Sequence, residues 1–274
     1  MPELPEVQSV VAALSPALVG AVVESVQVRR RDFIRLNGPA LRSDVPGRQI
    51  ASVSREGKRI LMDLAPQGRV VFHLGMSGRL ELAPIGNPLT PHTHFLMRFA
   101  GEPRELRHRD PRRFGGIWYL PDPRHDGDTS LSRLGPDALG IRVPTLRRLA
   151  QRRRTIKALL LDQSLISGMG NIYCDEALFA ARIHPAAAAW TLSQRQTKIL
   201  ACSIRKTLRA AIASGGSTLR DYRGPDGQAG AYQSLHRVYG RDGQACLRCG
   251  ATIERMRIAG RSTHYCPACQ RPMA

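Results

Sequence analysis

The sequence predicts a multi-domain α+β protein with a β-rich N-terminal domain, a helical domain and a small C-terminal cysteine module. Three observations carry this prediction. Short runs of alternating apolar and polar residues, separated by Gly and Pro, occupy residues 21–120. Residues 145–214 instead repeat their apolar residues at helical spacing. Beyond residue 240, four cysteines lie in two closely spaced pairs.

The chain is expected to begin with a helix over residues 6–18. The apolar residues of this segment share one helical face: Val7, Val10, Val11, Leu14 and Leu18. Pro5 stands near the first helical position, where a missing N–H does no harm, and Gly20 follows as a stop signal. We expect Pro16 to kink the helix or to end it early, because proline removes a helical hydrogen bond.

The alternating runs after this helix, such as KRILMDL, RVVFHL and HFLMRFA, predict an antiparallel sandwich or barrel. Residues 121–140 are rich in Pro, Asp and Gly, which is typical of a linker between domains. We therefore expect four segments: a β-rich domain at 1–128, a linker at 129–144, a helical domain at 145–236 and the cysteine module at 237–274.

The chain is strongly basic, with 41 Lys and Arg against 22 Asp and Glu and a net charge of +19. Arginines cluster in four runs, at 29–35, 104–113, 147–157 and 255–271. One such run can be an ordinary solvated face. Four runs with few compensating acids favour a phosphate-binding surface, such as one that binds nucleic acid.

The N-terminus lacks the basic and apolar regions of a secretory signal, and no run approaches the ~18 apolar residues that span a bilayer. We therefore expect a cytoplasmic protein. In that reducing compartment, the six cysteines favour a metal site or free thiols over disulfides.

The cysteine spacing is Cys246-x2-Cys249-x16-Cys266-x2-Cys269. Two pairs of this kind can complete one tetrahedral site, and the spacing fits a zinc ribbon with a β-hairpin between the pairs. His264 is near enough to compete, but four thiolates already close the coordination shell, which predicts one structural Zn²⁺. The other two cysteines, Cys174 and Cys202, fall in helical segments and are expected to be core thiols.

A second signal is the stretch SGMGNIY, in which Gly168 and Gly170 form a tight turn and Asn171 is expected to cap the next helix. Backbone N–H groups at such a helix start can bind a phosphate. A plain corner between two helices would explain the same residues, although the basic run that ends at Lys157 favours DNA.

A third signal is a set of residues on two Gly-flanked turns. Met76 lies in HLGMSG, and Arg112 and Phe114 lie two apart in DPRRFGG. An apolar wedge beside a guanidinium is suited to base extrusion, because the ring can part a base step while the guanidinium binds the orphaned base. Alternatively, Met76 and Phe114 are core residues.

The opening stretch MPELPEV has two interpretations as well. Removal of Met1 would leave Pro2 as a secondary amine, which is partly unprotonated at neutral pH and can attack a sugar C1′. Glu3 and Glu6 are close enough in sequence to serve as acids. In the alternative, the prolines stiffen a helix entry and the glutamates complement the helix dipole.

Together these residues resemble the formamidopyrimidine-DNA glycosylases (MutM) of the Fpg/Nei superfamily. The resemblance covers the whole chain, through MPELPEV, HLGMSG, DPRRFG, LGPDAL, SGMGNIY, GGSTLRDY, VYGRDGQAC and AGRSTHYCPACQ. It implies an N-terminal antiparallel β-sandwich with flanking helices, a helix–two-turn–helix domain and a C-terminal β-hairpin zinc finger. It also implies a monomer that excises oxidised purines, such as 8-oxoguanine and formamidopyrimidines, from duplex DNA and then cleaves the abasic site by β,δ-elimination. Such an enzyme would be associated with the nucleoid when bound to DNA.

The resemblance also implies roles for individual residues. Pro2 would be the nucleophile, Glu3 the acid that assists glycosidic-bond cleavage and ring opening, and Glu6 a support for the site. Lys58 would contact the phosphate beside the lesion and assist catalysis. The remaining residues would bind DNA. Asn171 and Arg261 would bind phosphates, and Arg261 would also count as a catalytic residue. Met76, Arg112 and Phe114 would form the wedge, Lys157 and the loop from Ser217 would lie near the flipped base, and His73 and His92 would contact the DNA backbone.

Two alternatives stay open. Endonuclease VIII-like enzymes, which act on oxidised pyrimidines, typically have Gly in place of Leu4 and lack this wedge set, so the oxidised-purine branch is favoured. A non-catalytic zinc-ribbon DNA-binding module would explain the charge and the cysteines, but not the combination of Pro2, Glu3 and Lys58. One departure from the family pattern is Gln8, where members usually have Glu.

Overall fold

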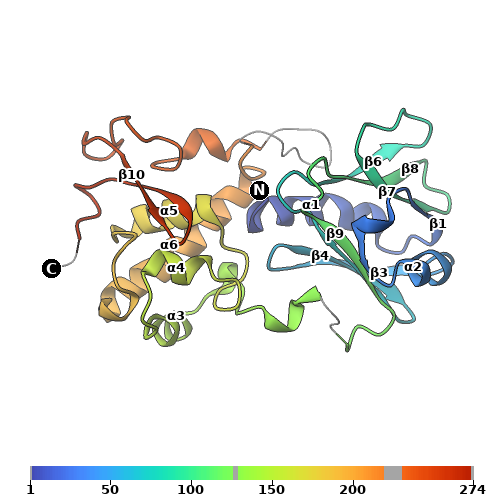
Figure 1. Ribbon diagram of the computed structural model, residues 1–274, viewed down its shortest axis with the longest axis horizontal. Helices are drawn as coiled ribbons and strands as arrows, with labels where there is room; N and C mark the ends of the chain where they lie inside the picture. Colours follow the sequence, from blue (N-terminus) through green and yellow to red (C-terminus); the bar gives the residue numbers. More distant parts are fainter. Residues whose placement is uncertain (1, 126–128, 219–229, 273–274) are drawn as a thin grey trace. The chain divides into compact units, whose positions relative to one another are not determined.

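The computed structural model describes residues 2–125, 129–218 and 230–272 (Figure 1). The chain forms two compact units. The first contains Met1–Arg133 and Gly215–Gly230, and the second contains Leu134–Ser214 and Ala231–Ala274. The described residues 215–218 and 230 therefore belong with the N-terminal unit, although they follow the helical segments in sequence.

The first helix, α1 (Leu4–Leu18), buries the apolar face that the sequence predicts. Its start is fixed by a capping box between Glu3 and Glu6, in which each carboxylate accepts a hydrogen bond from the other residue's backbone N–H. Pro16 does not end the helix early, because α1 continues through it to Leu18. A proline in the last turn removes only one of the few hydrogen bonds left there.

Two sheets follow α1 in the first unit. One has the order β1-β7-β8-β6 and consists of β1 (Val23–Val28), β6 (Arg79–Pro84), β7 (Thr93–Phe99) and β8 (Arg104–Arg109). The other has the order β2-β9-β5-β4-β3 and consists of β2 (Ile34–Leu36), β3 (Gln49–Glu56), β4 (Arg59–Ala65), β5 (Arg69–His73) and β9 (Gly116–Leu120). Strand pairing is antiparallel except between β2 and β9.

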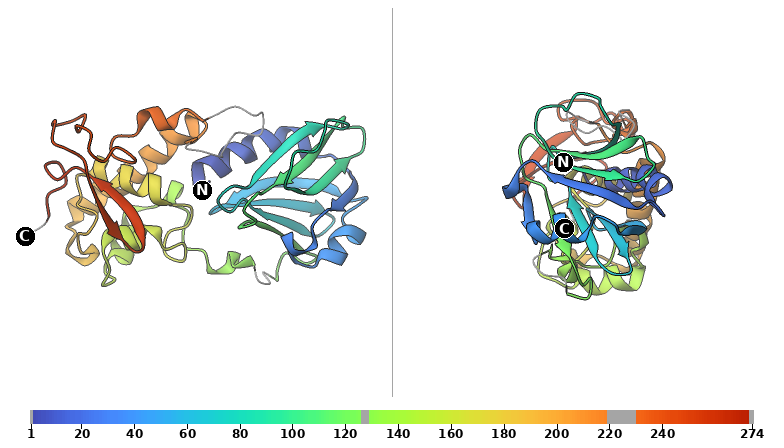
Figure 2. Two further views of the ribbon diagram at one scale, coloured as in Figure 1. Left: turned by 45° about the horizontal axis from the view of Figure 1, so that its top comes forward. Right: turned by 90° about the vertical axis from the view of Figure 1, so that its right-hand side faces the viewer.

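Apolar side chains from both sheets share one core, which confirms the predicted sandwich (Figure 2). The helix α1 packs against β3 and β6, which are edge strands of the two sheets, and so covers one edge of each sheet. The short helix α2 (Gly38–Asp44) packs against β1 and β9. Among the described residues the unit also contains the 3₁₀ segments η1 (Arg31–Phe33) and η3 (Leu131–Arg133).

The second unit is helical, as predicted, with a terminal hairpin. Its helices among the described residues are α3 (Val143–Ala150), α4 (Ile156–Leu161), α5 (Asn171–Ala181) and α6 (Gln194–Ala213), joined by the 3₁₀ segments η4 (Ala138–Gly140), η5 (Ala189–Thr191) and η6 (Tyr232–Leu235). The hairpin pairs β10 (Glu254–Ile258) with β11 (Arg261–Tyr265). The helix α5 packs against α4, α6 and β11, so it links the helical part to the hairpin.

All six cysteines lie in the described part of the chain, and no disulfide joins them. Cys174 is buried in α5, as expected for a core thiol. The same expectation is wrong for Cys202, which is exposed on α6 because Leu200, Ala201 and Ile204 occupy the buried face of that helix. None of the described helices is long and apolar enough to cross a membrane.

One core position of the sandwich is occupied by a histidine. His108 on β8 is fully buried, and its ring packs edge-on against Phe33 with 4.8 Å between ring centroids. Neither of its ring nitrogens has a hydrogen-bond partner within the described part of the chain. Burial lowers the pKa of His108 to about 3, so the ring is neutral in the folded protein at pH 7.

We predict that His108→Phe makes the protein less sensitive to acid. The pKa of His108 is about 3 in the folded state against 6.5 ordinarily, so the unfolded chain binds more protons as pH falls below 6.5. Between pH 7 and pH 5 this group alone should lower the wild-type free energy of unfolding by about 2 kcal/mol, and the variant should lack that loss. Urea titrations at both pH values measure it. The exposed His125→Phe is the control, and an unchanged pH dependence in His108→Phe would contradict the prediction.

Candidate active site and nucleic-acid interface

The first predicted site residues gather at the N-terminus of α1. Pro2 is buried, and Glu3 and Glu6 are only 2% and 1% exposed. The backbone N–H of Glu3 donates to Glu6 Oε2 at 2.8 Å, within the capping box. The positive end of the helix dipole stabilises both carboxylates there. The helix start therefore fixes the direction in which residue 2 enters the fold.

Glu6 also connects this helix start to a distant segment. Its Oε1 accepts a hydrogen bond from the backbone N–H of Ser217 at 2.7 Å. Gly216 has φ +81°, and a Cβ at this position would lie 2.6 Å from Glu6 Oε1, so only glycine fits. The structure thus places Ser217, a predicted DNA-binding residue, against Glu6. Most of the loop that Ser217 begins, residues 219–229, lies outside the described residues.

Lys58 lies at the tip of the β3–β4 hairpin. Glu56 pairs with Arg59, which leaves Gly57 and Lys58 as a two-residue turn, with Gly57 at φ +55°. His73 ends β5 directly opposite Arg59. Burial, followed by the charges of Arg59 and Lys58, lowers the pKa of His73 to about 4, so this imidazole is neutral at pH 7.

The wedge candidates lie on two neighbouring crossovers between the sheets. The β5–β6 segment carries Met76 and leads from the five-stranded sheet to the four-stranded one, while the β8–β9 segment carries Arg112 and Phe114 and leads back. The two crossovers run side by side because His73 pairs with Gly116 at one end and Arg79 with Arg109 at the other.

The wedge side chains reach solvent rather than the core. Phe114 is 55% exposed and Met76 is 37% exposed, which disfavours the alternative that they are core residues. The Arg112 guanidinium carbon lies 4.7 Å from the Phe114 ring centroid, within cation–π distance. His92 is also exposed, in a left-handed backbone conformation with φ +68°.

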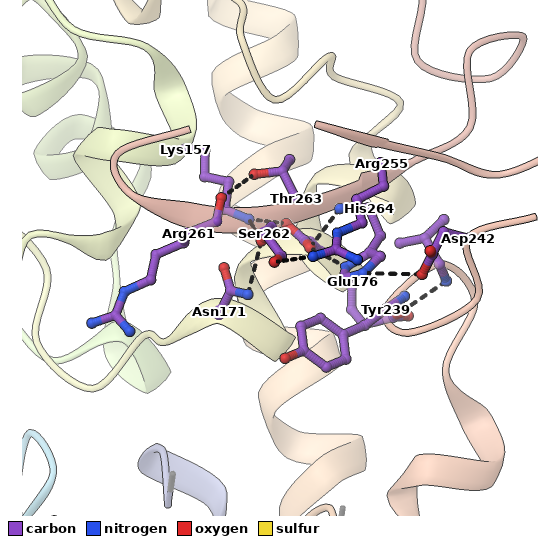
Figure 3. Close-up of polar contacts among 12 residues, drawn as sticks. Lys157, Asn171, Glu176, Tyr239, Asp242, Arg255, Arg261, Ser262, Thr263 and His264 are labelled. Carbon is purple, nitrogen blue, oxygen red and sulfur yellow. Dashed lines mark hydrogen bonds and ion pairs between the residues drawn. The ribbon is translucent and has the colours of Figure 1, made fainter. Parts of the chain in front are cut away.

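In the second unit, Asn171 lies at the junction between α5 and β11, the strand that Arg261 begins (Figure 3). Gly170, not Asn171, is the N-cap of α5, so the expected capping role of Asn171 is wrong. Asn171 is the first helical residue, and its Nδ2 instead donates to the Ser262 carbonyl at 2.9 Å. The turn before Arg261 has Ala259 and Gly260 at φ +49° and +72°, the signs that a type I′ hairpin turn requires. Arg261 is exposed and extends away from the junction.

Lys157 differs from its expected place near a flipped base. Its side chain is fully buried, and Nζ bonds Asp175 Oδ1 at 2.6 Å and the Ser262 carbonyl at 2.9 Å. It therefore presents no surface to DNA in this structure. The other carboxylate oxygen of Asp175 accepts the backbone N–H of His264 at 2.9 Å. Lys157 and Asp175 thus fasten α4 and α5 to the hairpin that carries Arg261.

A second buried acid of α5 holds another segment. Glu176 accepts backbone N–H groups of Arg237, Val238 and Tyr239 at 2.9–3.0 Å, and burial raises its pKa. Sequence reasoning missed both acids of α5. The signal was available in NIYCDEALF, where two adjacent acids interrupt an otherwise apolar helix and so require buried partners.

The four predicted metal ligands come together. One sulfur atom from each of Cys246, Cys249, Cys266 and Cys269 lies within 4.8 Å of the others. His264 does not compete, because its ring contacts Asp175 and Asp242. Four thiolates form the closed ligand set of one structural zinc ion, which leaves no open position for catalysis.

Family models match three segments of the chain. They are the "Formamidopyrimidine-DNA glycosylase N-terminal domain" at residues 1–117, the "Formamidopyrimidine-DNA glycosylase H2TH domain" at 134–223 and the "Zinc finger found in FPG and IleRS" at 243–272. Formamidopyrimidine-DNA glycosylase of Laribacter hongkongensis is 41% identical over 279 residues, covering 99% of this chain and 100% of the relative. That of Thermus thermophilus is 42% identical over 275 residues, covering 98% of each.

Solved structures agree with these sequence matches. The MutM (FPG) protein from Thermus thermophilus has a TM-score of 0.88 at 41% identity, with all of both chains covered. Lactococcus lactis Fpg in complex with DNA containing an abasic site has a TM-score of 0.91 at 33% identity, covering 98% of this chain and 100% of that one.

We predict that Lys157→Met destabilises the second unit by about 3–5 kcal/mol, because it leaves the Asp175 carboxylate buried without its cation. The double variant Lys157→Met/Asp175→Asn should recover part of this loss, since it removes the stranded charge. Denaturant unfolding followed by circular dichroism measures both. Lys198→Met removes an exposed lysine of α6 and is the matched control. If Lys157→Met unfolds at the same denaturant concentration as that control, the ion pair does not hold the junction.

Proposed function

The chain belongs to the formamidopyrimidine-DNA glycosylase family, and on that premise we propose that it excises oxidised purines from duplex DNA and then cleaves the strand. It is a DNA glycosylase with abasic-site lyase activity, and its substrates are 8-oxoguanine and formamidopyrimidines paired in duplex DNA. One chain acts alone, in the cytoplasm at the nucleoid. The observation that carries the proposal is the enclosed N-terminal group of Pro2, Glu3 and Glu6.

Pro2 supplies the nucleophile after Met1, which lies outside the described residues, has been removed. The secondary amine attacks the sugar C1′, and the bond to the damaged base breaks as the amine proton passes to the leaving base. The C1′–O4′ bond then breaks as the ring oxygen takes up a proton, and the nitrogen lone pair forms the iminium cation with C1′. Electron withdrawal by the iminium allows a proton to leave C2′ and the bond from C3′ to the phosphate oxygen to break. The place of Pro2 directly before the capping box of α1 supports this role, because a nucleophile held at one position reacts faster than a mobile one.

Glu3 donates the proton that the sugar ring oxygen needs when the ring opens. It stands next to the amine in sequence, and it is almost fully buried. Glu6 acts as a positioning residue, because its two oxygens hold the Glu3 and Ser217 backbones at 2.8 and 2.7 Å. A carboxylate that accepts two backbone hydrogen bonds stabilises both segments at once.

Other residues hold the DNA. Lys58 on its hairpin tip binds the phosphate beside the lesion, and Asn171 and Arg261 bind phosphates from the second unit. Met76 and Phe114 enter the duplex with Arg112 beside them, and the exposure of both apolar side chains on adjoining crossovers supports that role. His73, which is neutral at pH 7, and His92 contact the backbone through N–H groups.

We expect borohydride to trap a covalent protein–DNA adduct. Reduction converts the iminium between Pro2 and C1′ into a stable amine. The processed protein is incubated with an 8-oxoguanine:cytosine duplex and borohydride, and the adduct is resolved by denaturing electrophoresis. An undamaged duplex is the control. Absence of an adduct would refute the enzyme, and faster trapping on a dihydrouracil duplex would instead favour the oxidised-pyrimidine branch.

Pro2→Gly should reduce strand cleavage by at least about 100-fold while duplex affinity is retained, because the variant loses the ring that fixes the attacking amine. Glycine is small enough for Met1 still to be removed. Pro5→Gly is the matched control, since Pro5 lies in the first turn of α1. If the prolines only stiffen the helix entry, both variants lose activity alike. Full activity of Pro2→Gly would reject Pro2 as the nucleophile.

A further inference from the structure

The two crossovers that carry the wedge residues are joined by a buried carboxylate. Asp110, which directly follows β8, is fully buried. Its Oδ1 accepts the hydroxyl of Ser77 at 2.7 Å, and its Oδ2 accepts the backbone N–H of Gly115 at 2.8 Å. Ser77 directly follows Met76, and Gly115 directly follows Phe114. One side chain therefore bonds the immediate neighbours of both exposed apolar residues.

Further bonds hold the intervening turn. The backbone N–H of Arg112 lies 3.3 Å from both Asp110 Oδ1 and the Ser77 hydroxyl oxygen. The Asp110 carbonyl accepts the Arg113 N–H at 3.2 Å, and His94 Nε2 lies 3.0 Å from the same oxygen. Every polar group of the Asp110 side chain and carbonyl is thus directed at the two crossovers or at the strand beside them.

The backbones are in contact as well. A Cβ on Gly75 would lie 2.4 Å from the Gly115 nitrogen, and one on Gly115 would lie 2.3 Å from the His73 carbonyl oxygen. Only glycine at both positions permits this approach. The separation of the crossovers is therefore fixed by direct contact, and the Asp110–Ser77 bond fixes their relative direction.

We propose that Asp110 is the positioning residue of the wedge, holding Met76 and Phe114 in one fixed relation so that they enter the duplex together. A wedge that parts a base step must overcome the stacking energy of that step. If the two loops moved independently, part of the binding free energy would be spent on ordering them instead. Asp110 does not touch DNA itself, because it is fully buried. The inference rests on the proposed function and adds a residue to it.

The test separates base extrusion from chemistry. Asp110→Asn keeps the size of the side chain but removes its charge and one acceptor. We expect single-turnover excision of 8-oxoguanine to fall at least about tenfold. Cleavage of a duplex with a preformed abasic site, which has no base to extrude, should stay within about threefold of wild type. A merely structural role would lower both rates together.

Ser77→Ala is the second variant, because it removes only the bond from Asp110 to the Met76 crossover. It keeps the test possible if Asp110→Asn does not fold. It should show the same split. In the Met76→Ala/Phe114→Ala background, Asp110→Asn should have almost no additional effect on excision, because Asp110 acts through the wedge. Asp122→Asn, a partly exposed aspartate of the same unit, is the control.

The inference is overturned by wild-type excision rates in Ser77→Ala and Asp110→Asn, or by a parallel fall of excision and abasic-site cleavage in both. An additive effect in the wedge-less background would also reject it. A wild-type protein inactive on both substrates would instead refute the proposed function, so the two failures are distinguishable.

Discussion

Buried carboxylates that must find hydrogen bonds hold three of the functional segments of this protein in place. A carboxylate removed from water is strongly destabilising unless donors surround it, so its position dictates that of its donors. Glu6 holds the helix start and Ser217, Asp110 holds the two wedge crossovers, and Asp175 holds the hairpin against α4 and α5. In each case the segments lie far apart in sequence. The requirement for donors thus brings them to one place.

The opening stretch shows that a structural and a catalytic interpretation can both hold. Glu3 and Glu6 form a capping box, as a stiff helix entry would need, and Pro2 directly precedes it. Because α1 also covers one edge of each sheet, the first residues are attached to the whole sandwich through its core. A nucleophile at a chain terminus would normally be mobile. With Pro2 as the nucleophile that we propose, the rigid helix removes that motion before DNA binds, which lowers the entropy lost in the reaction.

Much of the fold and part of the site could be predicted from the sequence, and the reason is locality. The cysteine set, the hairpin at Lys58 and the helical face of α1 each depend on residues within one short segment. What the sequence could not show is which distant residues become partners. Lys157 ends a basic run that favours DNA, but its side chain bonds Asp175, 18 residues away, and the Ser262 carbonyl, 105 residues away. Asp110 lies inside a stretch of the sequence that is notable for its arginines, and nothing local shows that Ser77, 33 residues earlier, meets it.

The exposed apolar residues of the wedge also depend on a rigid support. Phe114 and Met76 face solvent, where the hydration of apolar side chains is unfavourable. The backbone that carries them is held in place by close contacts at glycine and by the Asp110 carboxylate. If the loops were free to fold inward, these side chains would bury themselves in the sandwich core. The stiff crossovers prevent that collapse, so the apolar surface remains available. The free energy of burying it is then released only when the side chains leave water, and insertion between stacked bases provides such an environment.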